Sequence, residues 1–456
     1  MVLQSVYNGL PIIHVAMNYR LGVFGFAQSE ALKAEGSENA GLRDQRLAIE
    51  WVRNKISWFG GDPNRITIFG QSSGGLAVGM QTLAYGGTKP PPFSQGICQS
   101  QALEPGITGN FTINAMKALV DHVGCNLADL HTNHTVECLR NLDMETLLNS
   151  SLATYESDIA HNIGDIWLPA VDGDFLPAPP SQLLKEGRFS NVTTMIGWCE
   201  DDVTFFTDTE IKTPEDTLKF ISSYVPDVTE SNIDKLLSLY PSSEFLENKE
   251  QELSAEFYRS ARIFRDILMV CQPAWYGESL SSQRNEVFLY DWNQTILEPI
   301  IAAVKGKTGF GTIHTSEFAY IFGNLSHYNV SGYPFHPTLS DYALRQRGSR
   351  SWSTFASSGR PGSSRHKTFQ GFNASFPIAP EPYVVDSNNE QKVNKSMPVN
   401  NTRPTEKEIY MFVAGGPHEG FSYFGGNKAH PAVKSQKLME RCAFINSPEM
   451  IEQLKY

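Results

Sequence analysis

The chain has 456 residues, of which 41% are hydrophobic, and its 49 acidic residues outnumber the 37 basic ones to give a net charge of −12. This surplus of negative charge argues against nucleic acid and anionic membrane surfaces as partners, because both would repel the protein. No apolar run approaches the roughly 18 residues that a membrane-spanning helix needs, so we predict no transmembrane segment. We find no internal repeat and no clear linker, and we expect a single domain over residues 1–456.

The first part of the chain alternates strand and helix patterns. Residues 11–19 form a nearly continuous apolar run, which predicts a strand buried on both faces of a parallel sheet. Apolar residues at helical spacing predict a helix over 42–59, which ends at the Gly-Gly-Asp-Pro-Asn turn of residues 60–64. Further strands are expected over 65–69 and 93–99.

The same strand signal recurs later, over residues 193–197, 287–291 and 408–414. Residues 206–285 are mostly helical in pattern, most clearly over 250–269, and we interpret them as an insertion over the carboxyl edge of the sheet. Residues 359–368 and 380–406 are polar and rich in Pro, Ser and Asn, which predicts surface loops. Strands that alternate with helices predict an α/β fold with a doubly wound, mostly parallel sheet.

The segment Phe-Gly-Gln-Ser-Ser-Gly-Gly of residues 69–75 joins a predicted strand to a helix of small residues. Gly-x-Ser-x-Gly in this context is typical of a nucleophile elbow, in which the serine sits on a sharp turn and the glycines let strand and helix approach closely. Ser72 would then be exposed at the carboxyl end of the sheet, where a histidine can take its proton. The backbone N–H of Ser73 would face the developing oxyanion. The alternative is an ordinary glycine-rich turn.

A serine nucleophile needs a histidine base and a carboxylate that orients the histidine, usually in the chain order Ser, acid, His. The candidates that follow predicted strands are the histidines His314 and His418 and the acids Glu200, Asp201 and Asp202. Asp172 and Asp174 lie in a Val-Asp-Gly-Asp turn, where turn chemistry explains their presence. Position along the chain ranks the two histidines about equally.

The six cysteines fit an oxidising compartment without requiring one. Cys125 and Cys138 are the expected disulfide, whose short ring would contribute about 3 kcal/mol by the entropy of loop closure. His131 and His134 lie between them and raise the alternative of a zinc site, but this spacing matches no standard structural site. Two unpaired thiols are the third alternative. We predict no metal and no cofactor.

Asn-x-Ser/Thr acceptor sequences are frequent, which favours a secreted, glycosylated protein. They occur at Asn110, Asn133, Asn149, Asn191, Asn293, Asn324, Asn329, Asn373, Asn394 and Asn400. The first residues, Met-Val-Leu-Gln-Ser-Val, lack the basic start and long apolar stretch of a signal peptide. These two observations conflict unless the chain begins late.

Several blocks carry a resemblance to a known family. One is Asn-Tyr-Arg-Leu-Gly-Val-Phe-Gly-Phe (18–26) followed by Asn-Ala-Gly-Leu-Arg-Asp-Gln (39–45), and another runs from Trp-Phe-Gly-Gly-Asp-Pro-Asn to Gly-Gln-Ser (58–72). Together with residues 169–177 and 351–356, they resemble the type-B carboxylesterases, the cholinesterase-like family that includes fungal lipases. The resemblance covers essentially the whole chain, and residues 440–454 are similar to fungal members in particular.

The resemblance implies an α/β-hydrolase fold and a catalytic triad. Ser72 matches the nucleophile of the family, Asp202 stands where the acid is usually glutamate, and His314 begins a block similar to that of the catalytic histidine. Val203 stands where the family has glycine. The implied reaction is hydrolysis of a small-molecule or lipid ester through an acyl-enzyme, without a cofactor, and Ser73 would be an oxyanion donor.

The chain also departs from the family at its start. The glycine-rich oxyanion loop of the family lies upstream of the Asn-Tyr-Arg strand, and this sequence begins after it. We therefore expect an N-terminally incomplete hydrolase in which the first strands of the sheet are missing. Two alternatives to an active esterase follow: a non-catalytic, cholinesterase-like binding protein, or an inactive fragment of an esterase.

Overall fold

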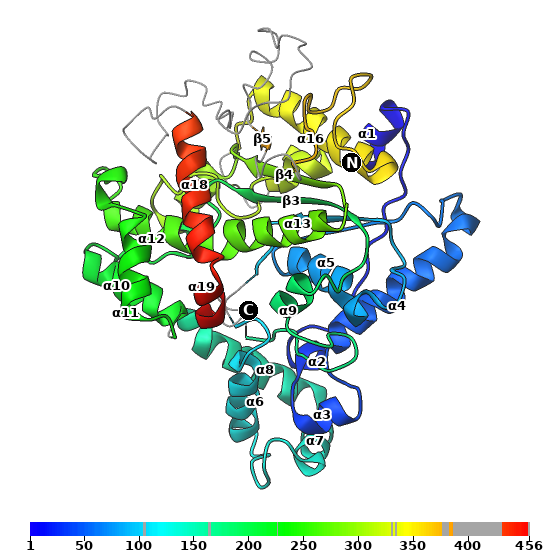
Figure 1. Ribbon diagram of the computed structural model, residues 1–456, viewed down its shortest axis with the longest axis vertical. Helices are drawn as coiled ribbons and strands as arrows, with labels where there is room; N and C mark the ends of the chain where they lie inside the picture. Colours follow the sequence, from blue (N-terminus) through cyan, green and yellow to red (C-terminus); the bar gives the residue numbers. More distant parts are fainter. Residues whose placement is uncertain are drawn as a thin grey trace.

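The computed structural model describes residues 1–103, 106–162, 166–225, 227–329, 332, 335–375, 383–385 and 431–454. Its centre is a parallel sheet flanked by helices, as predicted (Figure 1). The strands are β1 (Thr67–Gln71), β2 (Gln95–Gln99), β3 (Thr193–Cys199), β4 (Val287–Trp292) and β5 (Tyr383–Val385), and they lie side by side in chain order. Every neighbouring pair is parallel, so the carboxyl ends of the strands lie along one edge of the sheet.

Both faces of the sheet are buried, which explains why its central strands read as continuous apolar runs. Alternate residues point to different cores: Met195 and Phe288 face the side where Trp352 packs. Ile196 and Leu289 face the opposite side. Figure 1 shows the helices α13 (Gln272–Ser282) and α16 (Leu339–Ser358) on these two sides of the sheet.

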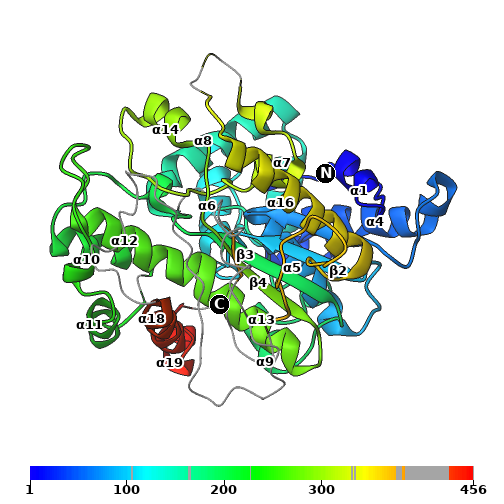
Figure 2. The ribbon, with the colours of Figure 1, turned by 90° about the horizontal axis from the view of Figure 1, so that it is seen from above.

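Helices occupy each connection between the strands (Figures 1 and 2). Before β1 lie α1 (Val2–Tyr7), α2 (Gly22–Phe26), α3 (Glu30–Ala34), α4 (Ala40–Lys55) and the 3-10 helix η1 (Ile56–Phe59). Between β1 and β3 lie α5 (Ser73–Leu83), η2 (Ala84–Gly87), α6 (Phe111–His122), α7 (Asn133–Arg140), α8 (Met144–Asn162) and α9 (Pro180–Lys185). After β4 come α14 (Glu298–Lys305), α15 (Phe318–Phe322), η6 (Leu325–Tyr328), α16, and finally α18 (Pro431–Ile445) and α19 (Pro448–Leu454).

The region predicted as a helical insertion is helical between β3 and β4. It contains η3 (Thr204–Phe206), α10 (Pro214–Tyr224), α11 (Glu230–Ser238), η4 (Ser242–Glu244), α12 (Ala255–Arg265), the π-helix η5 (Asp266–Cys271) and α13. The last of these, α13, packs on the face of β3 and β4. Arginines of α12 reach the residue after the carboxyl end of β3, so α12 lies beside that edge.

The predicted strand over residues 11–19 is wrong. These residues are extended but mostly exposed, and no strand of the described chain pairs with the outer edge of β1. The N–H of Ile12 instead donates to the hydroxyl of Ser5, and the N–H of Arg20 donates to the Asp44 carboxylate. An apolar run becomes a buried strand only where neighbours supply a ladder of backbone hydrogen bonds, and this segment has none.

Two predictions near the end of the chain have different outcomes. Residues 383–385, which were expected in a surface loop, form β5 and pair with β4. The strand expected over 408–414 lies outside the described residues, as do His418, Asn394 and Asn400.

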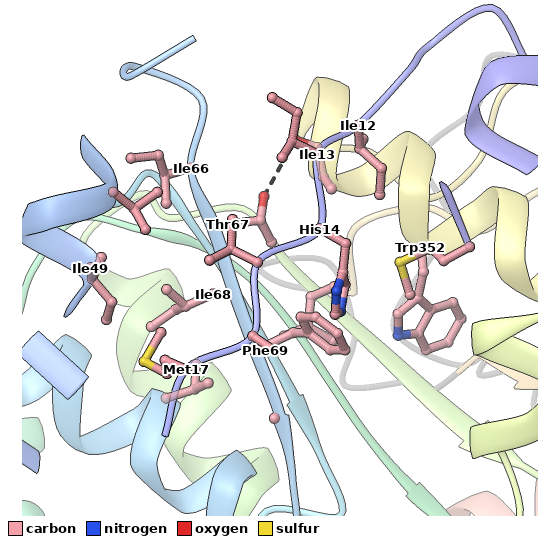
Figure 3. A pocket seen from close by; sticks show the side chains of 18 of the residues that line it. Ile12, Ile13, His14, Met17, Ile49, Ile66, Thr67, Ile68, Phe69 and Trp352 are labelled. Carbon is pink, nitrogen blue, oxygen red and sulfur yellow. Dashed lines mark hydrogen bonds between the residues drawn. The ribbon is translucent and has the colours of Figure 1, made fainter. Parts of the chain in front are cut away.

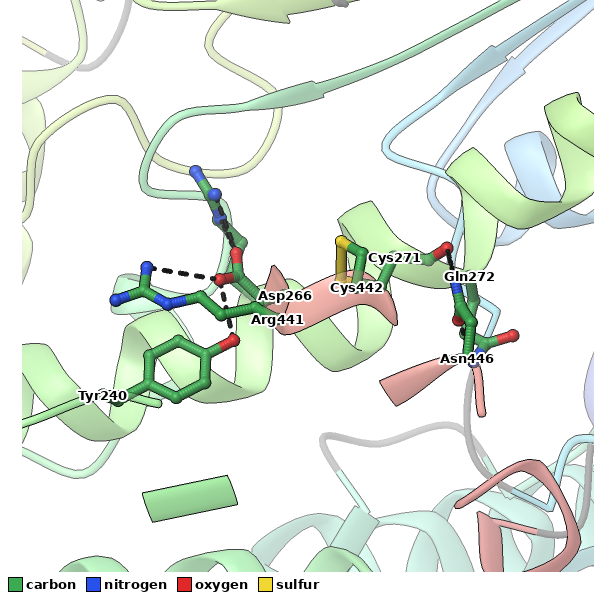
Figure 4. The surroundings of a disulfide bond; sticks show 8 residues. Tyr240, Asp266, Cys271, Gln272, Arg441, Cys442 and Asn446 are labelled. Carbon is green, nitrogen blue, oxygen red and sulfur yellow. Dashed lines mark hydrogen bonds and ion pairs between the residues drawn. A yellow bond between two sulfur atoms is a disulfide. The ribbon is translucent and has the colours of Figure 1, made fainter. Parts of the chain in front are cut away.

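Two disulfides cross-link the molecule. Cys125 is joined to Cys138, the pair expected from the sequence, so these thiols do not hold zinc. A second disulfide, which the sequence did not reveal, joins Cys271 at the end of η5 to Cys442 in α18 (Figure 4). Cys98 and Cys199 are buried free thiols. Among the described residues no helix is long and apolar enough to cross a bilayer, and no cluster of side chains has the composition of a metal site.

Candidate active site

Ser72 lies on a sharp turn between β1 and α5. Its backbone has φ 61° and ψ −124°, a conformation that residues other than glycine rarely adopt. A Cβ atom on Gly70 would lie 2.4 Å from the backbone of Gly74, which explains the glycine at that position. The strand and the helix therefore approach each other closely, and Ser72 is held at the carboxyl end of β1.

The structure brings the other two predicted triad residues together at the same edge of the sheet. Asp202 follows β3, and His314 lies between α14 and α15. The Nδ1 atom of His314 is 2.5 Å from Oδ1 of Asp202, whose side chain is fully buried. The other oxygen of Asp202 accepts the N–H of Cys199 at 2.8 Å. Both oxygens of the carboxylate thus have partners, which fixes its orientation.

The loop that carries His314 is tied to the segment that carries Asp202. The N–H of His314 donates to the carbonyl of Asp202 at 3.2 Å, and Asp201 accepts the N–H of Thr312 at 2.9 Å. Gly311 has φ 72°, and a Cβ there would lie 2.0 Å from the Asp201 carboxylate. Val203, which replaces the glycine of the family, has φ −107°, so it needs no unusual backbone angle.

The alternative acids are engaged elsewhere. Glu200 forms ion pairs with Arg262 and Arg265 at 2.9 and 3.0 Å. Asp172 forms an ion pair with Arg43 at 2.8 Å and accepts the N–H of Leu176, in keeping with a turn residue. Of the acids considered, Asp202 is the one that contacts His314.

Burial and charge perturb the carboxylates behind the site in opposite directions. Burial raises the pKa of Glu200, but the two neighbouring arginines outweigh it and hold this pKa below its ordinary value. Burial, together with the charge of Glu200, raises the pKa of Asp201 to about 7. Burial and Glu200 also raise the pKa of Asp291 well above its ordinary range. The cluster therefore retains protons that separate carboxylates would lose.

Two side chains near the pair were not singled out from the sequence. Glu317 is buried three residues after His314, and it accepts hydrogen bonds from Gln99 Nε2 at 3.1 Å and from Cys199 Sγ at 3.1 Å. Gln71 places its Nε2 atom 2.9 Å from Nε2 of His314. Their closeness in sequence to His314 and Ser72 was the available signal, but sequence does not give side-chain direction.

The surroundings of the histidine ring are partly apolar. The Phe206 ring packs edge-on against the His314 ring, with 5.6 Å between the centroids. Within the part of the chain that the structure describes, the Ser72 hydroxyl forms no hydrogen bond. The N–H of Ser73 lies at the first position of α5, where a helix has no partner of its own for the group.

A cavity of about 570 Å³ runs along the outer edge of β1 (Figure 3). Its lining is mainly apolar and includes Ile12, Ile68 and Trp352. The cavity reaches Gln71, but its lining includes neither Ser72 nor His314. It therefore separates the extended N-terminal segment from β1 and is distinct from the space in front of the predicted triad.

Most of the predicted glycosylation acceptors are accessible. The exposed ones are Asn110, Asn133, Asn149, Asn191, Asn324, Asn329 and Asn373. Asn293 is half-buried, and its backbone N–H donates to Val385 of β5. Glycan attachment stays a prediction, and the sites on exposed side chains are the better acceptors.

Comparisons with known proteins cover most of the sequence. The model of a family described as the carboxylesterase family matches residues 4–403. A protein of Arthroderma benhamiae described as a secreted lipase is 52% identical over the whole of this chain, which spans 75% of that protein. The inactive carboxylesterase-like protein VdtD of Byssochlamys spectabilis is 34% identical over 79% of this chain and 63% of its own length.

The fold has a match among solved structures. The crystal structure of EstA from Aspergillus niger superposes with a TM-score of 0.63 and 25% identity, over 78% of this chain and 66% of that one. A parallel sheet with helices on both faces and an esterase as structural neighbour make the fold an α/β-hydrolase. The chain spans three quarters of the Arthroderma protein but less than two thirds of VdtD. Because the family match extends over most of its length, the chain belongs to the carboxylesterase family.

Proposed function

We propose that this protein hydrolyses carboxylic esters through an acyl-enzyme, with Ser72 as nucleophile, His314 as base and Asp202 as the orienting acid. The observation that carries the proposal is the buried contact between Asp202 and His314 at the sheet edge where Ser72 occupies its strained turn. A histidine oriented by a carboxylate, at the same sheet edge as a serine on a nucleophile elbow, is the arrangement that acyl transfer requires.

The reaction proceeds in two stages. The Ser72 oxygen attacks the ester carbonyl while its proton passes to Nε2 of His314, and the N–H of Ser73 donates to the oxyanion. The alcohol leaves with the proton from His314, and the acyl group remains on Ser72. Water then attacks the acyl-enzyme, His314 takes its proton, and the carboxylic acid is released as Ser72 is restored.

The substrate is a small-molecule or lipid ester, and the protein is secreted and glycosylated. Membership of the carboxylesterase family supports the ester class, and the relative described as a secreted lipase supports both a lipid ester and the location. Two disulfides and many exposed acceptor sequences fit an oxidising compartment.

A non-catalytic role is the second candidate, because a relative 34% identical to this chain is described as inactive. A third is that the chain does not fold into a working site. The three differ in two measurements: whether the chain unfolds cooperatively on heating, and whether Ser72 reacts with an active-site reagent.

The test is labelling of the purified chain with a fluorophosphonate, followed by peptide mass mapping. We expect the adduct on Ser72, no adduct in Ser72→Ala, and retained labelling in the control Ser73→Ala, which changes the neighbouring serine but keeps its N–H. A cooperatively folded protein without label on Ser72 would contradict the proposal and favour a binding role. Label that persists in Ser72→Ala would contradict the assignment of the nucleophile.

A further inference from the structure

The amide of Gln71 contacts the atom of His314 that the proposed reaction uses. Gln71 is the last residue of β1, directly before Ser72, and its Nε2 atom lies 2.9 Å from Nε2 of His314. The opposite ring nitrogen, Nδ1, faces Asp202. The imidazole is therefore held at both nitrogens, between the end of β1 and the loop after β3.

The partners determine which nitrogen carries the proton. A carboxylate accepts hydrogen bonds and cannot donate one, so Nδ1 is the protonated nitrogen that donates to Asp202. An amide NH₂ group donates and cannot accept, so Nε2 presents its lone pair to Gln71. This is the tautomer of a general base.

The same lone pair must accept the proton of Ser72 when the serine attacks. One lone pair cannot serve two donors at full strength, and in this structure it faces Gln71, while the Ser72 hydroxyl has no hydrogen bond among the described residues. We propose that Gln71 is a positioning residue: it holds His314 in the base tautomer at rest and occupies Nε2 until the ester displaces its amide. The inference rests on the proposed function.

Three substitutions separate this role from a structural one. Gln71→Met keeps the length of the side chain without its donor, and Gln71→Asn keeps the amide but is too short to reach the ring. We expect both to raise the rate of Ser72 labelling by a fluorophosphonate about two- to tenfold, since a typical net hydrogen bond no longer has to be broken. Gln71→Glu replaces the donor by an acceptor and should slow labelling at neutral pH, because a carboxylate favours a proton on Nε2.

The pH profile is the readout that a structural role would not change. In Gln71→Glu the acid limb of the pH profile of the labelling rate should move to higher pH. It should stay in place in the control Gln182→Met, which removes an exposed amide from α9. The other titratable groups around the triad are unaltered in every variant; they are Asp201, Asp202, Cys199, Glu317 and Tyr328. Slower labelling in all three Gln71 variants with an unmoved acid limb would overturn the inference.

A second measurement does not depend on catalysis. In protein labelled with ¹⁵N-histidine, with the His314 signals assigned by their loss in His314→Asn, the Nε2 resonance should shift between the parent and Gln71→Met while Nδ1 stays in place. An unshifted Nε2 with intact labelling of Ser72 would overturn the inference alone. Absence of label on Ser72 in the folded parent would overturn the proposed function, and Nε2 would still report whether Gln71 holds the ring.

Discussion

At the scale of single residues, the proposed role of Asp202 in orienting His314 can be tested directly. This carboxylate is fully buried, and its two oxygens are used by the histidine ring and by a backbone N–H. In Asp202→Asn the amide could place a donor against Nδ1 and favour the wrong tautomer. We expect ester turnover to fall about 10³- to 10⁴-fold with little change in KM, measured by steady-state hydrolysis of an aryl ester.

Asp174→Asn is the matched control for this substitution. Asp174 is exposed and pairs with Arg43 at the surface, so its loss should leave turnover unchanged. Equal losses in the two variants, or a fully active Asp202→Asn, would show that Asp202 does not orient the base.

Glu38 gives a prediction about the dependence of stability on pH. It is buried and accepts the N–H of Ser29 at 3.0 Å, and burial raises its pKa to about 7. A folded state with a raised carboxyl pKa binds the proton more tightly than the unfolded state, so this contribution to stability is complete below the ordinary pKa and is lost as pH rises through 7. Glu38→Gln should match the parent at pH 5 and have the higher Tm at pH 8.

The measurement is Tm by circular dichroism across that range. Glu137→Gln, an exposed glutamate on α7, is the control and should reproduce the pH dependence of the parent. If Glu38→Gln followed the parent at every pH, the proton on Glu38 would have no part in that dependence.

At the scale of elements, helix α10 has a local start signal in its capping residues. Thr213 accepts the N–H of Asp216 at 3.2 Å, and Asp216 accepts the N–H of Thr213 at 2.9 Å, which together form a capping box. Thr213→Ala should lower the free energy of unfolding in urea by about 1 kcal/mol. Thr229→Ala should cost less, because Thr229 precedes α11 without a side-chain capping bond; an equal cost would argue against the capping box.

The elements that could be predicted from the sequence are those whose signal is local. The strands around Ile68, Ile97, Met195 and Phe288 have apolar residues at their centres, and they form a sheet because each pairs with a neighbouring strand. The apolar run at residues 11–19 does not form a strand. A run of apolar residues does not by itself indicate whether a partner strand will lie beside it. β5 was missed for the opposite reason: three residues in a polar stretch pair with β4 because of where the chain passes.

In the candidate site, too, the residues with a local signal could be predicted from the sequence, and the contacts between distant residues could not. Ser72 was predictable because strain at an elbow demands glycines nearby, and the turn signature is contiguous. Asp202 and His314 are 112 residues apart, and their assignment came from resemblance to a family. The contact of Gln71 with His314 depends on the direction of one side chain, which no pattern in the sequence specifies.

At the scale of the whole molecule, the Cys271–Cys442 disulfide ties α18 to the helices beside the carboxyl edge. Figure 4 shows that the carboxylate of Asp266, on η5 near the disulfide, contacts both the Tyr240 hydroxyl and the Arg441 guanidinium. The two cysteines are 171 residues apart, so the entropy of loop closure amounts to about 5 kcal/mol, against about 3 kcal/mol for the Cys125–Cys138 ring. The long separation is also why this pair could not be chosen from the sequence.

Replacing each pair by serines therefore gives a graded prediction. We expect the double variant at 271 and 442 to lower the Tm clearly more than the double variant at 125 and 138, both measured by scanning calorimetry. Both double variants keep the ion pair between Arg441 and Glu244, so this other contact that holds α18 is unchanged. An equal or smaller effect at 271 and 442 would show that the unfolded chain gains little freedom when this link is removed.

The strained backbone of Ser72 has a consequence for how this position can change in evolution. A residue with a side chain held at φ 61° and ψ −124° costs about 1–3 kcal/mol, and glycine would relieve most of it. If the Ser72 hydroxyl had no function, a mutation of Ser72 to glycine would make the fold more stable. Ser72 is thus a residue that stability selects against, and its survival in a lineage would itself be a record of selection for chemistry.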